Sequence, residues 1–401
     1  MSSNQPVKLR QFALPFYIPA FIAATGSGLL LPVTPLHIRA LGASFGALGL
    51  ILTFAALGAL AGNFMTVPLV SRIGKKNAMV LALGLEMLAG VLGWLTQNPY
   101  LFAPILFIRE MAHAIFFVNR LAYFRELVPE KQRGRALSLL GGESRMGTSL
   151  GPAIGGLVAA AFGAPVVFLL FALIHGLVLI FVLGFVPPDP VRLDALQKTA
   201  SLGKVLHIIR DHKKVFLTAG IGIVALTFVR EGRRVLFPLW GNAIGMAVEQ
   251  IGFLFTMSYV IEMLLFYPAG WLMDHKGRKY TAVPCLGLFA LGFFLMPLAQ
   301  SLPVFLLIVV MVAIGNGLGS GINMTLSTDY APPDQVVEFL ATWRILTDAG
   351  AVVSPSVIGF IASATSLVWS APALGLIGAL GVIIMYKLPE KTQPGSGTGL
   401  S

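Results

Sequence analysis

The chain has 401 residues, of which 56% are apolar and only 11% are charged, and its net charge is +11. Soluble domains carry about 25% charged residues, and no soluble globule of this size could hide so much apolar surface from water. The composition therefore excludes a soluble enzyme, a disordered chain and a nucleic-acid-binding domain. Lipid must be the main solvent of this chain.

Long apolar segments follow one another along the sequence. A helix needs about 20 apolar residues to cross the hydrocarbon core of a bilayer, whereas the strands of a membrane barrel are short and alternate in polarity. Twelve segments fit the helical pattern, at residues 12–37, 45–70, 77–97, 101–127, 136–162, 165–187, 214–238, 247–273, 281–299, 303–327, 336–362 and 366–388. We therefore predict an all-α membrane protein with twelve transmembrane helices.

The basic residues are concentrated at one end of these predicted helices. If both termini are cytoplasmic, 20 Lys and Arg residues lie in cytoplasmic segments and only Arg39 lies clearly outside. Lys and Arg favour the cytoplasmic loops of membrane proteins. The pattern predicts a multi-pass protein of the plasma (inner) membrane with both termini in the cytoplasm, and the positive charge reports this topology.

The two halves of the chain match each other at a constant offset of 203 residues. The matches include Pro35 and Pro238, Gly49 and Gly252, Thr53 and Thr256, Gly147 and Gly350, Pro152 and Pro355, and Gly156 and Gly359. We predict two six-helix bundles related by a parallel internal repeat, the arrangement of transporters that move one bundle against the other. The expected domains are an N-terminal bundle at 1–187, a cytoplasmic linker at 188–213, a C-terminal bundle at 214–391 and a flexible tail at 392–401.

A short motif occurs after the second helix of each half. The copy in the second half contains Gly270, Asp274, Gly277, Arg278 and Lys279, and it resembles the cytoplasmic-loop signature of the major facilitator superfamily position for position. The copy in the first half keeps Arg72, Gly74, Lys75 and Lys76 but has Val67 and Ser71 in place of Gly and Asp. The resemblance implies the major facilitator fold and a gating role for this motif. The alternative is that these basic residues only anchor the topology.

The fifth predicted helix is rich in small residues. Its segment Gly147, Gly151, Pro152, Gly155 and Gly156 is similar to the superfamily's fifth-helix motif, which implies an exporter that exchanges its substrate for protons. The glycines at i, i+4 and i+8 lie on one face and allow another helix to approach closely, and Pro152 favours a kink. Packing of helices alone is the alternative interpretation.

Polar residues on the fourth, seventh and tenth predicted helices are candidates for a substrate cavity. Such residues are costly inside a membrane, so they line cavities or pair with one another. On the fourth helix, where Arg109 is similar to the family's arginine, the expected polar face carries Arg109, His113 and Arg120; the tenth carries Asn316, Ser320 and Asn323 on one face, and the seventh contributes Arg230. Structural polar packing is the alternative, and we interpret the isolated His175 as structural.

Carboxylates inside the predicted helices are candidates for proton coupling. We select Glu110, Glu231, Glu262 and Asp348 for this role, with Glu86 and Glu143 as further intramembrane acids. Adjacent residues such as Arg109 and Glu110 do not share a helix face, so we expect their partners on other helices. Static ion pairs that hold helices together are the alternative role for each carboxylate.

These patterns together predict a secondary active transporter that moves a small organic solute by alternating access, as a proton-coupled exporter. The alternatives are a proton symporter for uptake of an organic anion or metabolite and, remotely, a non-transporting membrane sensor. We expect no enzyme activity, no metal and no cofactor, with the proton gradient as the energy source. The expected partners are a small-molecule substrate, protons and the lipid bilayer, without nucleic acid, and the expected state is a monomer.

Overall fold

The structure is a computed structural model that describes residues 9–188, 202–333 and 335–388. Every regular element in these ranges is a helix, which confirms the predicted fold class. Residues 189–201 of the predicted linker and the predicted tail at 392–401 lie outside the described residues.

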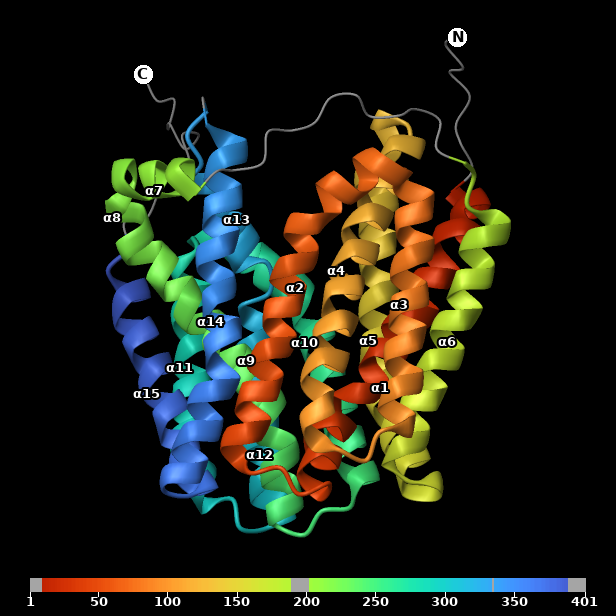
Figure 1. Cartoon of the computed structure of the whole chain (residues 1–401). Coiled ribbons are helices and arrows are strands. Elements are labelled where there is room, and N and C mark those ends of the chain that lie inside the picture. Colours follow the sequence, from red (N-terminus) through yellow and green to blue (C-terminus); the bar gives the residue numbers. More distant parts are fainter. Residues whose placement is uncertain (1–8, 189–201, 334, 389–401) are drawn as a thin grey trace, which may run out of the picture. The chain divides into compact units, whose positions relative to one another are not determined.

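Six long helices form the first half of the chain (Figure 1). They are preceded by short helical segments at Leu9–Phe12 and Ala13–Tyr17. The long helices are α1 (Ile18–Ala40), α2 (Phe45–Ile73), α3 (Lys75–Leu95), α4 (Phe102–Leu127), α5 (Arg133–Phe162) and α6 (Ala164–Phe185).

The second half begins with two short helices, α7 (Leu202–Asp211) and α8 (Lys213–Val215), within and just after the predicted linker. A π-helical turn at Phe216–Gly220 then leads into the long helices. These are α9 (Ile221–Ala243), α10 (Val248–Lys276), α11 (Lys279–Leu295), α12 (Leu302–Leu318), α13 (Ile322–Tyr330), α14 (Val336–Ala364) and α15 (Leu367–Tyr386).

Eleven described segments are long and apolar enough to cross a membrane, with α12 and α13 counted as one. The twelfth predicted segment is α5, which is helical over 30 residues but is kept less hydrophobic by its glycines, serines and charged residues. The prediction of one continuous tenth helix is wrong. The chain leaves α12 at Gly319 and restarts α13 after Gly321, whose positive φ of 83° suits a residue without a Cβ.

The described chain divides into two compact units. The first unit contains Met1–Thr199, Arg233–Tyr259 and Val352–Leu367. The second unit contains Ala200–Gly232, Val260–Ala351 and Val368–Ser401. The first unit therefore includes α1 to α6 together with end segments of α9, α10 and α14.

The internal repeat is visible in the helix contacts of each unit. In the first unit α1 packs along α5, and a Cβ added at Gly147 would overlap the carbonyl oxygen of Phe21. In the second unit a Cβ added at Gly350 would overlap the carbonyl oxygen of Val224. Both residues of the second contact are offset by 203 from those of the first, so each half uses a glycine at the same place for the same close helix crossing.

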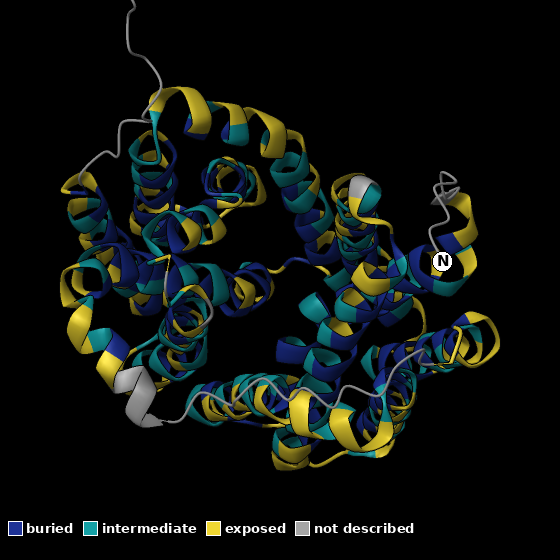
Figure 2. Ribbon diagram, turned by 90° about the horizontal axis from the view of Figure 1, so that it is seen from above, coloured by how far each residue is buried: buried dark blue, intermediate teal, exposed yellow. Residues whose placement is uncertain are grey.

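Each long helix buries one side and exposes apolar side chains on another (Figure 2). In the first unit the buried side of the chain's N-terminal end meets α4 through an aromatic cluster. The ring of Phe16 lies 6.0 Å from Tyr123 and 5.2 Å from Phe124. The exposed leucines and phenylalanines are what lipid would contact, as expected for helices that hide only part of their surface in a bundle.

Candidate functional site

Two helix crossings in the first unit are related by the repeat. At one, a Cβ added at Gly49 of α2 would lie 2.5 Å from the carbonyl oxygen of Pro355 and 3.1 Å from the Cα of Gly359, both on α14. At the other, Gly252 of α10 lies in the same way against Pro152 and Gly156 of α5. Only glycine permits such an approach of one backbone to another. The fifth-helix motif therefore lies at a crossing, with Gly151 and Gly155 against α1 and Gly156 against α10.

Hydrogen bonds join the same two crossings. The hydroxyl of Thr53 donates to the carbonyl oxygen of Val352 at 3.0 Å and lies 2.6 Å from the hydroxyl of Ser356. At the other crossing the backbone N–H of Ala153 donates to the hydroxyl of Thr256 at 3.1 Å. Thr53 and Thr256 are repeat equivalents, so both crossings pair a threonine on one helix with a partner helix that contains a proline.

A buried cluster of ionisable side chains joins α3, α4 and α6. The Glu86 carboxylate is fully buried, with its Oε1 3.0 Å from Nδ1 of His113 and its Oε2 3.5 Å from Nε2 of His175. His175 is also fully buried, and its Nδ1 lies 2.9 Å from the carbonyl oxygen of Phe171. The expectation that His175 is isolated is therefore wrong, because its ring faces a carboxylate.

Arg109 and Glu110 lie next to this cluster and pair with each other. The expectation that these adjacent residues have partners only on other helices is wrong, because their long side chains bend toward each other from neighbouring positions. The Arg109 guanidinium also lies 5.9 Å from the ring centre of Phe171. Arg109 thus links the predicted cavity face of α4 to the carboxylate of α3, with which it interacts electrostatically.

Arg120, the third predicted basic residue of α4, lies two to three turns further along that helix and is buried. Its Nη2 lies 3.4 Å from the hydroxyl of Ser144 on α5, and its guanidinium stacks 5.6 Å from the ring of Phe116. The Oε1 of Glu143 is buried nearby on α5 without a hydrogen-bond partner among the described residues. Arg120 on α4 and Glu143 on α5 thus form a second pair of ionisable side chains, whose charges interact electrostatically without a direct contact.

A chain of three side chains connects α9, α10 and α12 in the second unit. Arg230 donates from Nε to Oδ1 of Asn316 at 2.6 Å, and Asn316 donates from Nδ2 to Oε2 of Glu262 at 2.6 Å. The Nη2 of Arg230 also donates to the carbonyl oxygen of Gly319 at 2.9 Å. This carbonyl lies just after the end of α12 and also accepts the backbone N–H of Ile322 at 3.3 Å, so the guanidinium is its second donor at the helix break. These three predicted site residues are brought together.

The other polar residues of the predicted tenth helix, Ser320 and Asn323, lie beyond the end of α12. The break at 319–321 separates them from Asn316, so the three residues do not lie on one continuous helix. Ser320 lies in the turn, and its backbone N–H donates to the carbonyl oxygen of Gly317 at 3.0 Å. Asn323 lies on α13, where its Oδ1 accepts a hydrogen bond from the indole of Trp343 at 2.8 Å.

The remaining predicted carboxylates lie on α9 and α14. Asp348 forms an ion pair with Arg344 at 3.6 Å, one turn away on α14. Glu231 is half-buried on α9. Asp348 and Glu231 interact electrostatically with each other.

The repeated loop motif carries one ion pair in each copy. Lys75 lies 2.6 Å from Glu126 of α4, and Arg278 lies 2.7 Å from Asp329 of α13 at the equivalent positions of the repeat. The predicted acceptor Asp274 is exposed instead and has no ion pair or hydrogen bond within the described part of the chain.

The other motif residues define the turns and anchor their helices. Gly74 and Gly277 both have positive φ angles, 82° and 104°, at the turns that lead into α3 and α11. Lys76 donates to the carbonyl oxygens of Leu183 and Val186, and Lys279 lies 3.9 Å from the ring centre of Tyr386. Two motif residues remain outside these contacts: Arg72 is exposed, and Gly270 has open space where a Cβ would be.

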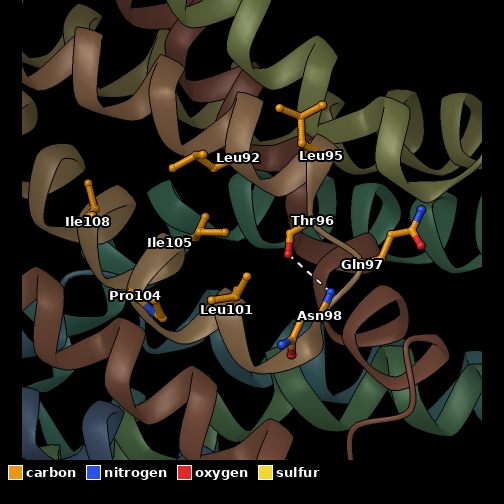
Figure 3. A pocket seen from close by; sticks show the side chains of 9 residues that line it. All are labelled: Leu92, Leu95, Thr96, Gln97, Asn98, Leu101, Pro104, Ile105 and Ile108. Carbon is orange, nitrogen blue, oxygen red and sulfur yellow. Dashed lines mark hydrogen bonds between the residues drawn. The ribbon is translucent and has the colours of Figure 1, made fainter.

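A cavity of about 800 Å³ lies in the first unit beside the turn between α3 and α4 (Figure 3). Leucine and isoleucine side chains line most of it, and Thr96, Gln97 and Asn98 supply the polar atoms. All of its lining residues are uncharged, and the exposed Leu95 and Leu101 show that it opens at the apolar surface. The ionisable clusters described above lie elsewhere.

These helices, the repeat and the buried ionisable clusters define an integral multi-pass membrane protein of the transporter class. The family model of the Major Facilitator Superfamily matches residues 16–231 and 220–399. The chain belongs to that family, and it is a transporter, not an enzyme.

Curated relatives include transporters with different substrates. The chain is 24% identical over 275 residues to Multidrug resistance protein 2 of Bacillus subtilis. The matched region covers 66% of this chain and 68% of the relative. It is 27% identical over 289 residues to the riboflavin transporter RibZ of Clostridioides difficile. This matched region covers 59% of this chain and 63% of the relative.

Solved structures share the fold over nearly the whole chain. A bacterial homolog of the human lysosomal transporter Spinster matches with a TM-score of 0.77 at 14% identity, covering 95% of this chain and 97% of that one. A D-xylose-proton symporter matches with a TM-score of 0.70 at 18% identity, covering 94% and 98%. At these identities the likeness concerns the fold alone.

Proposed function

We propose that this transporter exports a small organic molecule across the plasma membrane in exchange for protons. The observation that carries the proposal is the glycine segment of α5, which lies in backbone contact with α1 and with α10. This segment is similar to the motif of proton-exchanging exporters. The multidrug resistance relative from Bacillus subtilis supports the same direction.

The polar side chains of α4 in the first unit and those of α9 and α12 in the second unit are each candidates for contact with the substrate. Arg109, His113 and Arg120 are the candidates on α4, and Arg230 and Asn316 are those in the second unit. Arginine and asparagine offer several hydrogen-bond donors, which suits a substrate that carries carbonyl, carboxylate or phosphate oxygens. The protein would act without a cofactor, and the proton gradient would supply the energy.

Proton symport of an organic anion into the cell is the second candidate function. The guanidinium groups of Arg109 and Arg230 favour an anionic substrate, and the fold is shared with a D-xylose-proton symporter. In this alternative the same side chains bind the substrate, but substrate and proton move in the same direction.

Purified full-length protein in lipid vesicles separates these candidates. A thermal-shift screen with drugs, riboflavin, sugars and organic acids would first identify a ligand, since a ligand that binds the folded state raises the unfolding temperature. Transport of that ligand would then be followed together with the internal pH. Substrate and proton fluxes in opposite directions support export by exchange, fluxes in the same direction support symport, and substrate flux without proton flux contradicts both.

A further inference from the structure

Among the described carboxylates of the first unit, that of Glu86 is the most deeply buried. Its side chain has no exposed area, and it lies between an imidazole on α4 and an imidazole on α6. A carboxylate in this position is stable only if it is paired or protonated, because transfer of a bare charge from water into a membrane interior is costly. The question is therefore where the protons of this cluster lie.

The hydrogen-bond geometry of His175 answers part of this question. Its Nδ1 lies 2.9 Å from the carbonyl oxygen of Phe171, and since a carbonyl only accepts, this nitrogen must carry a proton. Its Nε2 faces Oε2 of Glu86 at 3.5 Å, and neither atom forms a hydrogen bond with the described residues. Two lone pairs would repel each other there, so a proton on either atom stabilises the pair.

That proton has two positions that the same heavy atoms allow. If it is bound to Nε2, His175 is a cation that faces a carboxylate anion. If it moves to Oε2, the O–H bond forms as the N–H bond breaks, and a neutral histidine faces a neutral carboxylic acid. The hydrogen bond to the carbonyl of Phe171 and the tilted contact with the Phe171 ring, with 4.0 Å between ring centres, are compatible with both positions of the proton.

His113 connects this buried pair to a more accessible place. Its Nδ1 lies 3.0 Å from Oε1 of Glu86, while 35% of its side chain is exposed. A proton that reaches the His113 imidazole from water can pass to the carboxylate over a single hydrogen bond. Histidine is suited to this step because its ordinary titration range lies between about pH 5 and 8.

The surrounding helices bring few other charges to the cluster. From α4, Arg109 interacts electrostatically with Glu86 and is paired with Glu110, and Arg120 acts from further along the same helix. From α1, the residue facing His175 is Gly26, where a Cβ would lie 2.8 Å from the imidazole. The ionisable residue of α2, Arg72, is exposed at the end of that helix. Arg109 therefore favours the ionised carboxylate, whereas burial favours the protonated one.

We propose that Glu86, His113 and His175 form a proton-binding site of this transporter, in which Glu86 and His175 hold one proton and His113 exchanges it with water. The proposal rests on the proposed coupling to protons and locates that coupling on α3, α4 and α6. It differs from the carboxylates that the sequence favours, Glu110, Glu231, Glu262 and Asp348.

Infrared difference spectroscopy on the full-length protein in lipid vesicles tests the site without a substrate. The pH would be varied between about 5 and 8, and carboxylic-acid and imidazole bands would be compared between the wild type and Glu86→Gln. We expect a titrating band in the wild type that is lost in Glu86→Gln and shifted in His175→Asn. The matched control is Glu130→Gln, since Glu130 is 90% exposed in the short 3-10 helix Glu130–Gln132 between α4 and α5, and it should keep the wild-type band.

The outcomes separate this proposal from the proposed function. An unchanged titration in folded Glu86→Gln overturns the site, as does loss of the titration in Glu110→Gln alone. If Glu86→Gln does not fold, the partly exposed His113→Asn replaces it, and an unchanged titration there overturns the site. A titration that depends on Glu86 in a protein whose substrate transport moves no protons supports the site and rejects proton exchange as the function. Proton-coupled transport that Glu86→Gln leaves fully pH-dependent supports the function and overturns the site.

Discussion

Substitution of Gly49 by alanine should loosen the crossing of α2 and α14. The added Cβ would lie 2.5 Å from the carbonyl oxygen of Pro355, about 1 Å short of the ordinary contact distance of about 3.5 Å. Overpacking of this kind costs about 1–3 kcal/mol, while alanine in a helix regains about 0.5–1 kcal/mol relative to glycine. Because the overlap is with backbone, which cannot rotate away, the cost lies in the upper part of the first range, about 2–3 kcal/mol. Subtracting about 1 kcal/mol leaves about 1–2 kcal/mol, which corresponds to a factor of about 5–30 in the equilibrium between closed and open crossings.

Thiol labelling measures this change. With Cys285 replaced by serine, a single cysteine at Ser356 would report whether the crossing is closed, because Ser356 contacts Thr53 across it. We expect labelling to be about 5–30 times faster in Gly49→Ala than in the parent. The control is Gly287→Ala on α11, where an added Cβ has no atom within 4 Å. Labelling at the parent rate in a folded Gly49→Ala protein would refute the reasoning.

Three further predictions concern topology and polar contacts. In a cysteine-free background, single cysteines at Gln97 and Ser301 should react with a membrane-impermeant reagent added outside intact cells; protection of either would contradict the predicted orientation. Asp329→Asn should lower the free energy of unfolding by about 1.5–3 kcal/mol, and Asp274→Asn by much less because Asp274 is exposed; equal thermal shifts would argue against the ion pair. Arg230→Lys should destabilise by about 1–3 kcal/mol, because lysine lacks the fork that reaches both acceptors at the end of α12, and an unchanged unfolding temperature would show that this contact is dispensable.

Most of the helical architecture could be predicted because local signals mark where helices begin and end. The second helix was expected from residue 45, and the hydroxyl of Ser44 does accept the backbone N–H of Ala47 at the start of α2. The same helix ends at Gly74, whose positive φ stops it three residues beyond the expected end. The repeat was equally readable, because glycines at helix crossings cannot be exchanged freely for larger residues.

The Glu86 cluster could not be predicted because it depends on the rotation of three helices. Apolar residues surround His175 in the sequence of α6, and nothing there indicates which neighbour its ring faces. One signal was present: a single ionisable residue in so apolar a helix is costly unless it is paired. The pairing of Arg109 with Glu110 escaped prediction for another reason, since the helix-face rule treats side chains as short while these two are long and flexible.

The tenth predicted helix shows where hydropathy alone fails. Its apolar residues run through the break, so composition predicts one span. The interruption follows from Gly317, Gly319 and Gly321, which pack closely or take a positive φ, and the guanidinium of Arg230 adds a hydrogen bond to the carbonyl of Gly319. A glycine-rich run of this kind beside an asparagine indicates a helix break. The residue that contacts the break, Arg230, lies on another helix, so the local sequence does not reveal it.

The ion pairs of the two loop motifs constrain the orientation of their helices to different degrees in the two halves of the repeat. Lys75 meets Glu126 through one point charge, which fixes a distance but not the relative orientation of the two side chains. Arg278 meets Asp329 through two nitrogens, at 2.7 and 3.4 Å, and the planar fork resists twisting. In the second half the longer basic side chain, arginine, pairs with the shorter acid, aspartate. In the first half the shorter basic side chain, lysine, pairs with the longer acid, glutamate. If only one member of an ion pair were replaced by its repeat equivalent, the two side chains would no longer match in length. Replacement of both members would transfer the orientation preference of the pair to the other half.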